Sequence, residues 1–269
     1  MTAPALRIAP PLGVIAGTRG RRLVERNVVQ SRHAWIVIVS GFFEPLFYLL
    51  GLGFGLGRLV GDVPGPDGVP IPYAAFVAPA LLASSAMNGA IYESTMNVFH
   101  KLKYQKLYDT ILTTPLGVAD IAVGEISFAL LRGTLYAIGF FTVMLLFGLI
   151  RSPWGLLVIP SALLVGWAFA AVGMACTTFM RSWQDFDLVN LFVLPLFLFS
   201  ATFYPVTAYP AALRLFVEWT PLYQGVELIR AITTGIVAPV TFVHVAYLVA
   251  MGIGGLFVTS RRLDRLLRR

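Results

Sequence analysis

Long apolar runs constrain the fold of this chain more than any other feature. One of them, GLLVIPSALLVGWAFAAVGMA, extends from Gly155 to Ala175 without a charged residue. A helix needs about 20 apolar residues to cross the hydrocarbon core of a bilayer. Helices and closed barrels are the structures that satisfy the backbone there, and barrel strands alternate apolar with polar residues. Because this run does not alternate, it predicts a transmembrane helix.

The composition extends this prediction to the whole chain. Hydrophobic residues make up 58% of it and charged residues 12%, whereas ordinary soluble domains are about 25% charged. We expect an all-α membrane protein with six transmembrane helices, at about 34–56, 73–99, 121–150, 155–180, 188–203 and 240–259. The fifth of these runs is short for a full crossing. The expected organisation is an N-terminal segment, one transmembrane domain and a basic tail, at 1–33, 34–259 and 260–269.

Lysine and arginine are distributed unevenly over the two sides of these spans. Fifteen of the twenty lie in the N-terminal segment, in the loop after the second span, at Arg181 and in the tail, and four lie on the other side. Since cytoplasmic loops carry an excess of these residues, both termini are expected in the cytoplasm. The expected location of the protein is the cell membrane, that is, the inner or plasma membrane. The net charge of +7 sits at the ends of apolar runs, so membrane lipids rather than nucleic acid are the expected contacts.

The loop after the second span contains a helical stripe of apolar residues. The stripe is formed by Tyr104, Leu107, Tyr108, Ile111 and Leu112, and the opposite face carries Lys103, Lys106, Asp109 and Thr110. The pattern predicts one amphipathic helix on the cytoplasmic side. It is compatible with a helix lying passively in the lipid headgroups and with a docking surface for a cytoplasmic partner. A weaker amphipathic pattern at Arg19 to His33 is compatible with an interfacial helix and with a cluster of positive charges that only sets the orientation in the membrane.

Four ionisable residues lie within the predicted spans: Glu44, Glu93, Glu125 and Arg132. Charged groups in a membrane are costly, and they face a protein interior or a cavity. These four could line a transport pathway or form structural ion pairs that gate it. We favour the second interpretation, because Arg132 is the one clear positive partner at depth.

The segment from Phe203 to Thr234 is half polar and interrupted by prolines, among them Pro205 and Pro221. It predicts either short helices that dip into the membrane from outside or an ordinary outer loop. Glu227 and Arg230 are spaced to pair on one helical face.

Motifs for intrinsic catalysis are missing from the sequence. It has no G-x-x-x-x-G-K-[ST] loop for nucleotide phosphates, one cysteine, and three scattered histidines without metal-ligand spacing. We therefore expect no enzyme activity, no metal site and no cofactor bound by this chain.

Three stretches resemble a known family. They are MNGAIYESTMNVFHKLKYQKLYDTILTTPLGVADIAVGEI from Met87, LLRGTLYAIGF from Leu130, and FYPVTAYPAALRLFVEWTPLYQGVELIRA from Phe203. In these stretches the chain is similar to ABC-2 type permeases, the transmembrane subunits of ATP-binding-cassette exporters. The resemblance is strongest to the branch that contains nodulation-type lipo-oligosaccharide export permeases.

The resemblance implies a role for each segment. Residues 101–114 would form the coupling helix that docks on the ATPase subunit, and the N-terminal segment would form a connecting helix beside it. Residues 203–234 would form re-entrant outer helices that close the pathway from outside. The outer gate would comprise Tyr204, Pro205, Pro221, Glu227 and Arg230. ATP and Mg²⁺ would be bound by separate nucleotide-binding subunits, and a second permease copy, identical or related, would complete the exporter. The substrate would be an amphiphile such as a lipo-oligosaccharide, a glycolipid, a polysaccharide or a drug.

Two other classes remain as alternatives. An ion-coupled secondary carrier could use Glu44, Glu93 and Glu125 as proton sites, although the sequence lacks broken helices in two matching halves. A membrane-embedded enzyme acting on lipid-linked sugars would need an acid/base pair, and no spacing points to one.

Overall fold

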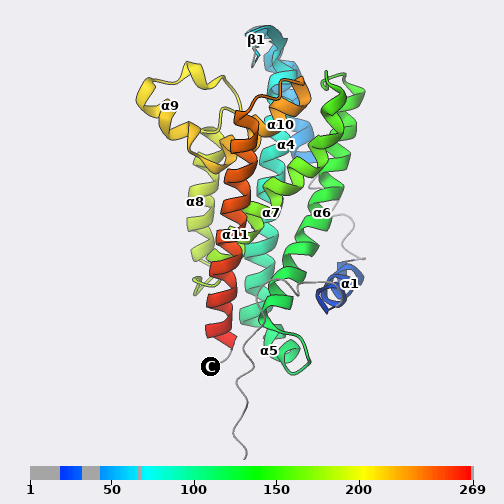
Figure 1. Ribbon diagram of the computed structural model, residues 1–269, viewed down its shortest axis with the longest axis vertical. Coiled ribbons are helices and arrows are strands. Elements are labelled where there is room, and N and C mark those ends of the chain that lie inside the picture. Colours follow the sequence, from blue (N-terminus) through cyan, green and yellow to red (C-terminus); the bar gives the residue numbers. More distant parts are fainter. Residues whose placement is uncertain (1–18, 32–42, 66–67, 268–269) are drawn as a thin grey trace, which may run out of the picture.

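The computed structural model describes residues 19–31, 43–65 and 68–267, and most of these residues are helical. Long helices run side by side along the longest axis of the molecule (Figure 1). Within the described ranges, five helices are long and apolar enough to cross a membrane: Phe43–Val60, Tyr73–Tyr104, Val118–Leu146, Pro153–Thr177 and Val240–Leu267. The prediction of an all-α membrane protein is therefore confirmed.

The fifth predicted span corresponds to α8, Asp185–Leu198, which has 14 residues. At 1.5 Å per residue this helix is about 21 Å long, less than the hydrocarbon thickness of about 30 Å. The helix exists as expected, but it does not reach the length of the other five, so the count of six stays a prediction. The first predicted span began at residue 34, and its residues 34–42 lie outside the described part of the chain.

The helix Phe43–Val60 contains a wide π-helical segment, η2 (Leu49–Leu56), and ends with α3 (Gly57–Val60). An antiparallel hairpin follows, in which β1 (Asp62–Pro64) pairs with β2 (Pro70–Pro72). This hairpin leads directly into the central helix of the bundle.

That central helix begins with α4 (Tyr73–Tyr92) and continues through the π-helical segments η3 (Glu93–Asn97) and η4 (His100–Tyr104). Small residues dominate its first half, and the side chains of Ala74, Ala78 and Ala83 are buried. Small side chains let membrane helices approach closely, which explains how α4 fits among its neighbours. Those neighbours are α6 (Val118–Leu146), α7 (Val158–Thr177, preceded by η5, Pro153–Leu157) and α10 (Pro221–Thr234).

The last helix, α11 (Val240–Leu267), packs along α7. At their crossing, a Cβ atom added to Gly255 would lie 2.7 Å from the backbone carbon of Ala171. Glycine is thus required here by the close approach of two backbones.

The segment from Phe203 to Thr234 forms short helices, as expected. They are η6 (Val206–Ala208), α9 (Ala211–Glu218) and α10. Figure 1 shows α9 projecting sideways from the upper end of the bundle, whereas α10 lies within it. Most of α10 is buried against α4, α7 and α11.

The N-terminal helix α1 (Arg19–Ser31) packs across α6, with Leu23 against Gly124. It confirms a helix in this basic segment. Figure 1 shows α1, α5 (Leu107–Leu112) and the C-terminal end of α11 together at the lower end of the molecule. The three segments predicted to be cytoplasmic therefore lie at one end of the bundle.

One prediction at this end was wrong. The expected helix does not run continuously from Tyr104 to Leu112, because Lys106 has a left-handed backbone conformation, with φ 47° and ψ 32°. Tyr104 ends η4, and α5 begins only at Leu107. The left-handed residue turns α5 away from the axis of the preceding helix.

Candidate functional site

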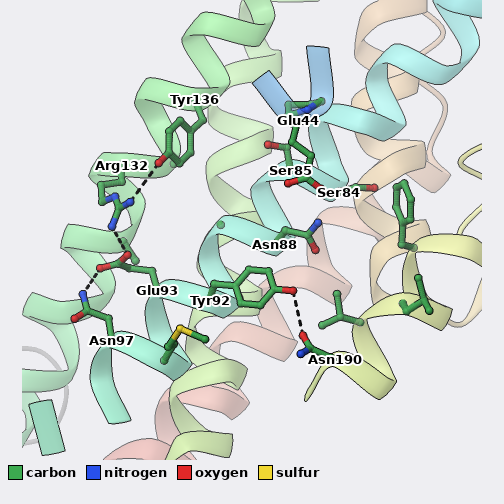
Figure 2. Close-up of a pocket in the computed structure, with 18 of the residues that line it drawn as sticks. Glu44, Ser84, Ser85, Asn88, Tyr92, Glu93, Asn97, Arg132, Tyr136 and Asn190 are labelled. Carbon is green, nitrogen blue, oxygen red and sulfur yellow. Dashed lines mark hydrogen bonds and ion pairs between the residues drawn. The ribbon is translucent and has the colours of Figure 1, made fainter. Parts of the chain in front are cut away.

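A polar cavity of about 960 Å³ opens between the Phe43 helix, α4, α6 and α8. The central helix contributes a polar face at intervals of about one turn, formed by Ser84, Ser85, Asn88, Tyr92, Glu93 and Asn97. Figure 2 shows these side chains arranged along one side of the helix. An otherwise apolar, mostly buried helix thus presents its polar residues to this cavity.

An ion pair crosses the cavity from α6 to the central helix. Arg132 pairs with Glu93, and Asn97 donates a hydrogen bond to the same carboxylate. Arg132 also donates to the hydroxyl of Tyr136 at 3.3 Å. The Arg132 and Glu93 side chains are 21% and 12% exposed, so both charges are largely shielded from solvent. Arg132 therefore has a carboxylate partner, Glu93.

The other walls of the cavity come from the Phe43 helix and α8. Glu44 faces it from the first, as Figure 2 shows. From the second, Asn190 accepts a hydrogen bond from the hydroxyl of Tyr92 at 3.1 Å. Three of the four predicted intramembrane ionisable residues, Glu44, Glu93 and Arg132, thus line one cavity, and Glu125 does not.

Aromatic side chains stand at the end of the cavity nearest to α5. His100 and Trp183 line it, and Tyr104 stacks on both, with ring centroids 5.8 and 5.6 Å away. Tyr104 therefore connects the end of the central helix to the α7–α8 link rather than forming part of α5.

Glu125 belongs to a separate buried cluster, which we call the Lys101 hub and define as Asn27, Lys101 and Glu125. Lys101 Nζ lies 2.6 Å from Glu125 Oε2, and the amide of Asn27 donates to the same oxygen at 3.1 Å. Sequence reasoning counted Lys101 as an exposed loop lysine and missed this role. Nothing local marks it, because its partners are on α1 and α6, far away in sequence.

The side chains of α5 divide between the protein interior and the surface. Tyr108 and Ile111 are buried, and Leu107 and Leu112 are partly buried. The apolar stripe thus packs on protein. Burial raises the pKa of Tyr108 well above its usual value, and the negative charge of Glu125 adds to that effect. Lys103, Lys106 and Asp109 are exposed around this helix.

At the opposite end of the bundle, the predicted pair of Glu227 and Arg230 is confirmed. The Arg230 guanidinium also donates to the carbonyls of Ala201 at 2.9 Å and Phe76 at 3.3 Å, and lies 3.9 Å from the centroid of the Phe76 ring. This buried arginine joins α10 to the start of α4. Tyr204 is exposed and packs on Tyr209, Pro205 is partly buried, and Pro221 begins α10.

Among the residues that the structure describes, no group of three or more His, Cys, Asp or Glu side chains is placed to hold a metal ion. The polar groups that the cavity offers to a ligand are hydroxyl and amide side chains and the ion pair of Arg132 and Glu93.

Comparison with known proteins identifies the family. Residues 20–234 match the ABC-2 type transporter family. Nodulation protein J of Rhizobium leguminosarum bv. trifolii is 32% identical over 212 residues, which cover 78% of this chain and 79% of that protein. The bv. viciae protein of the same name is 30% identical over 246 residues, 91% of this chain and 93% of the relative. The inner membrane transport permease YadH of Escherichia coli is 23% identical over 209 residues, 77% of this chain and 75% of YadH. The chain is therefore a multi-pass membrane protein that belongs to the ABC-2 type transporter family.

Proposed function

We propose that this chain is the permease subunit of an ATP-binding-cassette exporter that moves an amphiphilic substrate out of the cytoplasm or the inner leaflet. The observation that carries the proposal is the polar cavity, which lies within a bundle of membrane-length helices. Membership of the ABC-2 type transporter family supports it. Both termini are assigned to the cytoplasm, which agrees with the position of α1, α5 and the end of α11 at one end of the bundle (Figure 1).

The lining of the cavity suits an amphiphile. Serine, asparagine and tyrosine side chains of the central helix can exchange hydrogen bonds with a polar headgroup, while Leu81, Val193 and Phe197 provide apolar contacts. A lipo-oligosaccharide, a glycolipid, a polysaccharide or a drug falls within this range. The likeness to proteins named nodulation protein J supports the first of these.

Energy enters, in this proposal, through the exposed side of α5. Asp109 on α5 and the preceding Lys103 and Lys106 form a charged surface there, and the ATPase subunit that docks on it binds ATP and Mg²⁺. Because Tyr108 is buried beside Glu125, a displacement of α5 acts directly on the Lys101 hub and so on the central helix and α6. The hub is thus the proposed mechanical link between docking and the cavity.

A second permease copy completes the transporter. The Phe43 helix exposes Phe43 and Phe47, and α8 exposes Leu191, Leu194 and Leu198. These two helices flank the cavity, so a partner placed against them would enclose it. In this arrangement α8, although short, forms the sixth crossing.

Co-purification tests the docking surface. The double variant Lys106→Glu/Asp109→Lys reverses two exposed charges and should abolish recovery of the ATPase subunit, while the folded permease is still obtained. The matched control Arg58→Gln/Asp62→Asn changes exposed charges at the opposite end and should leave assembly intact. Unchanged ATPase recovery with the reversed charges contradicts the docking assignment. Transport by the reconstituted chain alone, driven by a proton gradient, would instead establish the secondary carrier.

A further inference from the structure

An apolar groove of about 730 Å³ runs between α4, α7, α8 and α11, distinct from the polar cavity. Its walls are mainly aliphatic and aromatic, and they include Phe169, Val172, Leu188, Phe192, Leu196 and Met251. Four of the lining side chains carry a polar atom or a thiol: Thr95, Cys176, Arg181 and Asp185. A groove of this kind suits a hydrocarbon chain rather than a sugar or a nucleotide.

The length of the groove matches one leaflet of a bilayer. Along α8 its lining extends from Asp185 to Leu196. At 1.5 Å per residue, these eleven steps cover about 16 Å. Half of a hydrocarbon core of about 30 Å is nearly the same distance. An acyl chain that enters at the Asp185 end would therefore reach the midplane at the far end.

Cationic side chains gather at the Asp185 end. Arg181 is exposed there. The Arg262 guanidinium lies 3.9 Å from the centroid of the Phe179 ring, which lines the groove. It donates one hydrogen bond to the carbonyl of Thr178 at 3.4 Å, and its buried Nε has no hydrogen-bond partner among the described residues. Arg261 and Arg265 are exposed on the same last turns of α11. This end of the groove thus offers positive charge next to apolar surface.

The one carboxylate that lines the groove is engaged by the backbone. Asp185 accepts hydrogen bonds from the backbone N–H groups of Arg181 and Ser182, at 2.6 and 3.1 Å. These bonds hold the turn that precedes α8 and position Arg181 at the groove entrance. The groove is accordingly built for a ligand with an anionic head and an apolar tail.

We infer that the apolar groove binds an anionic glycerophospholipid, with an acyl chain along α7 and α8 and its phosphate between Arg181 and Arg262. Basic pockets between transmembrane helices are suited to anionic headgroups at the membrane surface. The proposed orientation places this end in the cytoplasmic leaflet, and the inference depends on the proposed function only for that leaflet. The lipid would hold α8, which is shorter than the five membrane-length helices, against α7 and α11.

Native mass spectrometry of the purified full-length chain tests this inference. The probes are phosphatidylglycerol and phosphatidylcholine with identical acyl chains. We expect the unmodified protein to retain phosphatidylglycerol preferentially. Arg181→Gln and Arg262→Gln should each weaken its binding about fivefold, the effect of one basic residue at an anionic surface. The charge control Arg58→Gln, at the opposite end, should retain the preference.

A second pair of variants tests the tail. Cys176 is an exposed groove residue, so Cys176→Phe fills the groove from outside the packed core and should reduce retention of both lipids. The control Leu156→Phe adds an aromatic ring at an exposed position outside the groove, and it should leave the retention of both lipids unchanged. Size-exclusion chromatography verifies that both variants are folded.

Two results would overturn the inference. The first is that the unmodified protein retains phosphatidylglycerol and phosphatidylcholine equally, and that Arg181→Gln does so too. The second uses Cys176, the one cysteine of the sequence. If mild oxidation in membranes links two chains through Cys176, a second copy rather than a lipid covers the groove.

Discussion

Lys101 and Glu125 form an ion pair with an Nζ to Oε2 distance of 2.6 Å, and their side chains are 5% and 3% exposed. The pair connects the end of the central helix to α6, and Asn27 adds α1 through its bond to the same carboxylate. Removing one partner of a buried pair leaves an uncompensated charge, whereas replacing both by apolar residues is often neutral. Variants of the Lys101 hub therefore test whether this ion pair stabilises the lower end of the bundle.

The substitution Lys101→Met should lower the free energy of unfolding by about 3–5 kcal/mol, because Glu125 is left buried and unpaired. Thermal unfolding in nanodiscs, followed by tryptophan fluorescence, measures the change. The double variant Lys101→Met/Glu125→Leu should recover most of the loss. Lys103→Met, at an exposed neighbouring position, should change stability by no more than about 0.5 kcal/mol. Equal losses for the single and double variants would contradict an energetic role for the pair.

The pair of Arg132 and Glu93 is partly exposed to the polar cavity. Its loss should therefore lower the free energy of unfolding less than the loss of the Lys101–Glu125 pair. Arg132→Met should lower the free energy of unfolding by about 1–3 kcal/mol, the cost of leaving a buried group without its hydrogen bond. Tyr136→Phe removes an acceptor of Arg132 and should cost about 0.5–1.5 kcal/mol. Exchanging the charges in Glu93→Arg/Arg132→Glu should restore part of the melting temperature. If the exchanged variant melts no higher than Arg132→Met, the pairing is not what stabilises these helices.

The close contact of α7 and α11 can be probed with neighbouring glycines. Gly255→Ala places a methyl group against the backbone of Ala171, so it should separate the helices at a cost of about 1–3 kcal/mol. A Cβ atom on Gly254 meets nothing within 4 Å, so Gly254→Ala should leave stability unchanged or raise it by up to about 1 kcal/mol through helix propensity. Melting temperatures of the two variants in the same lipid test this expectation. Equal shifts in melting temperature would argue against a tight crossing of α7 and α11 at Gly255.

Two arginines at the end of the bundle opposite α5 provide another matched pair. Arg230→Met removes a buried cation from Glu227 and from two backbone carbonyls, so a loss of about 3–5 kcal/mol is expected. Arg214 pairs with Glu218, but the two side chains are 48% and 33% exposed, and Arg214→Met should cost about 0–1 kcal/mol. Denaturation of both variants under one condition provides the comparison. A larger loss for Arg214→Met would reverse the assignment of the structural arginine.

Local sequence pattern predicted much of the structure of residues 101–114 and failed at one residue. The apolar stripe identified the residues of α5 that face the protein, because helical spacing depends only on neighbours in sequence. The break at Lys106 was missed, since lysine carries none of the turn signals of glycine or asparagine. Its left-handed conformation follows from the packing of Tyr108 and Ile111 on one side and of Tyr104 on the other.

Ion pairs within one helix were predictable from the sequence, whereas ion pairs between helices were not. The pair of Glu227 and Arg230 was predicted because its residues are one turn apart on one helix. The pairs of Glu93 with Arg132 and of Lys101 with Glu125 join different helices. Spacing along the chain does not reveal such partners.

The sequence by itself determined that the chain is a helical membrane protein, because hydrophobic length and the cost of unsatisfied backbone leave few alternatives in a bilayer. It also indicated the family through three continuous stretches. Only the tertiary structure decided which polar residues share the cavity, which lysine is buried beside Glu125, and that an apolar groove ends in a cluster of arginines. The physical reason is that these features arise where separate helices meet, and the contacts between them depend on packing in three dimensions.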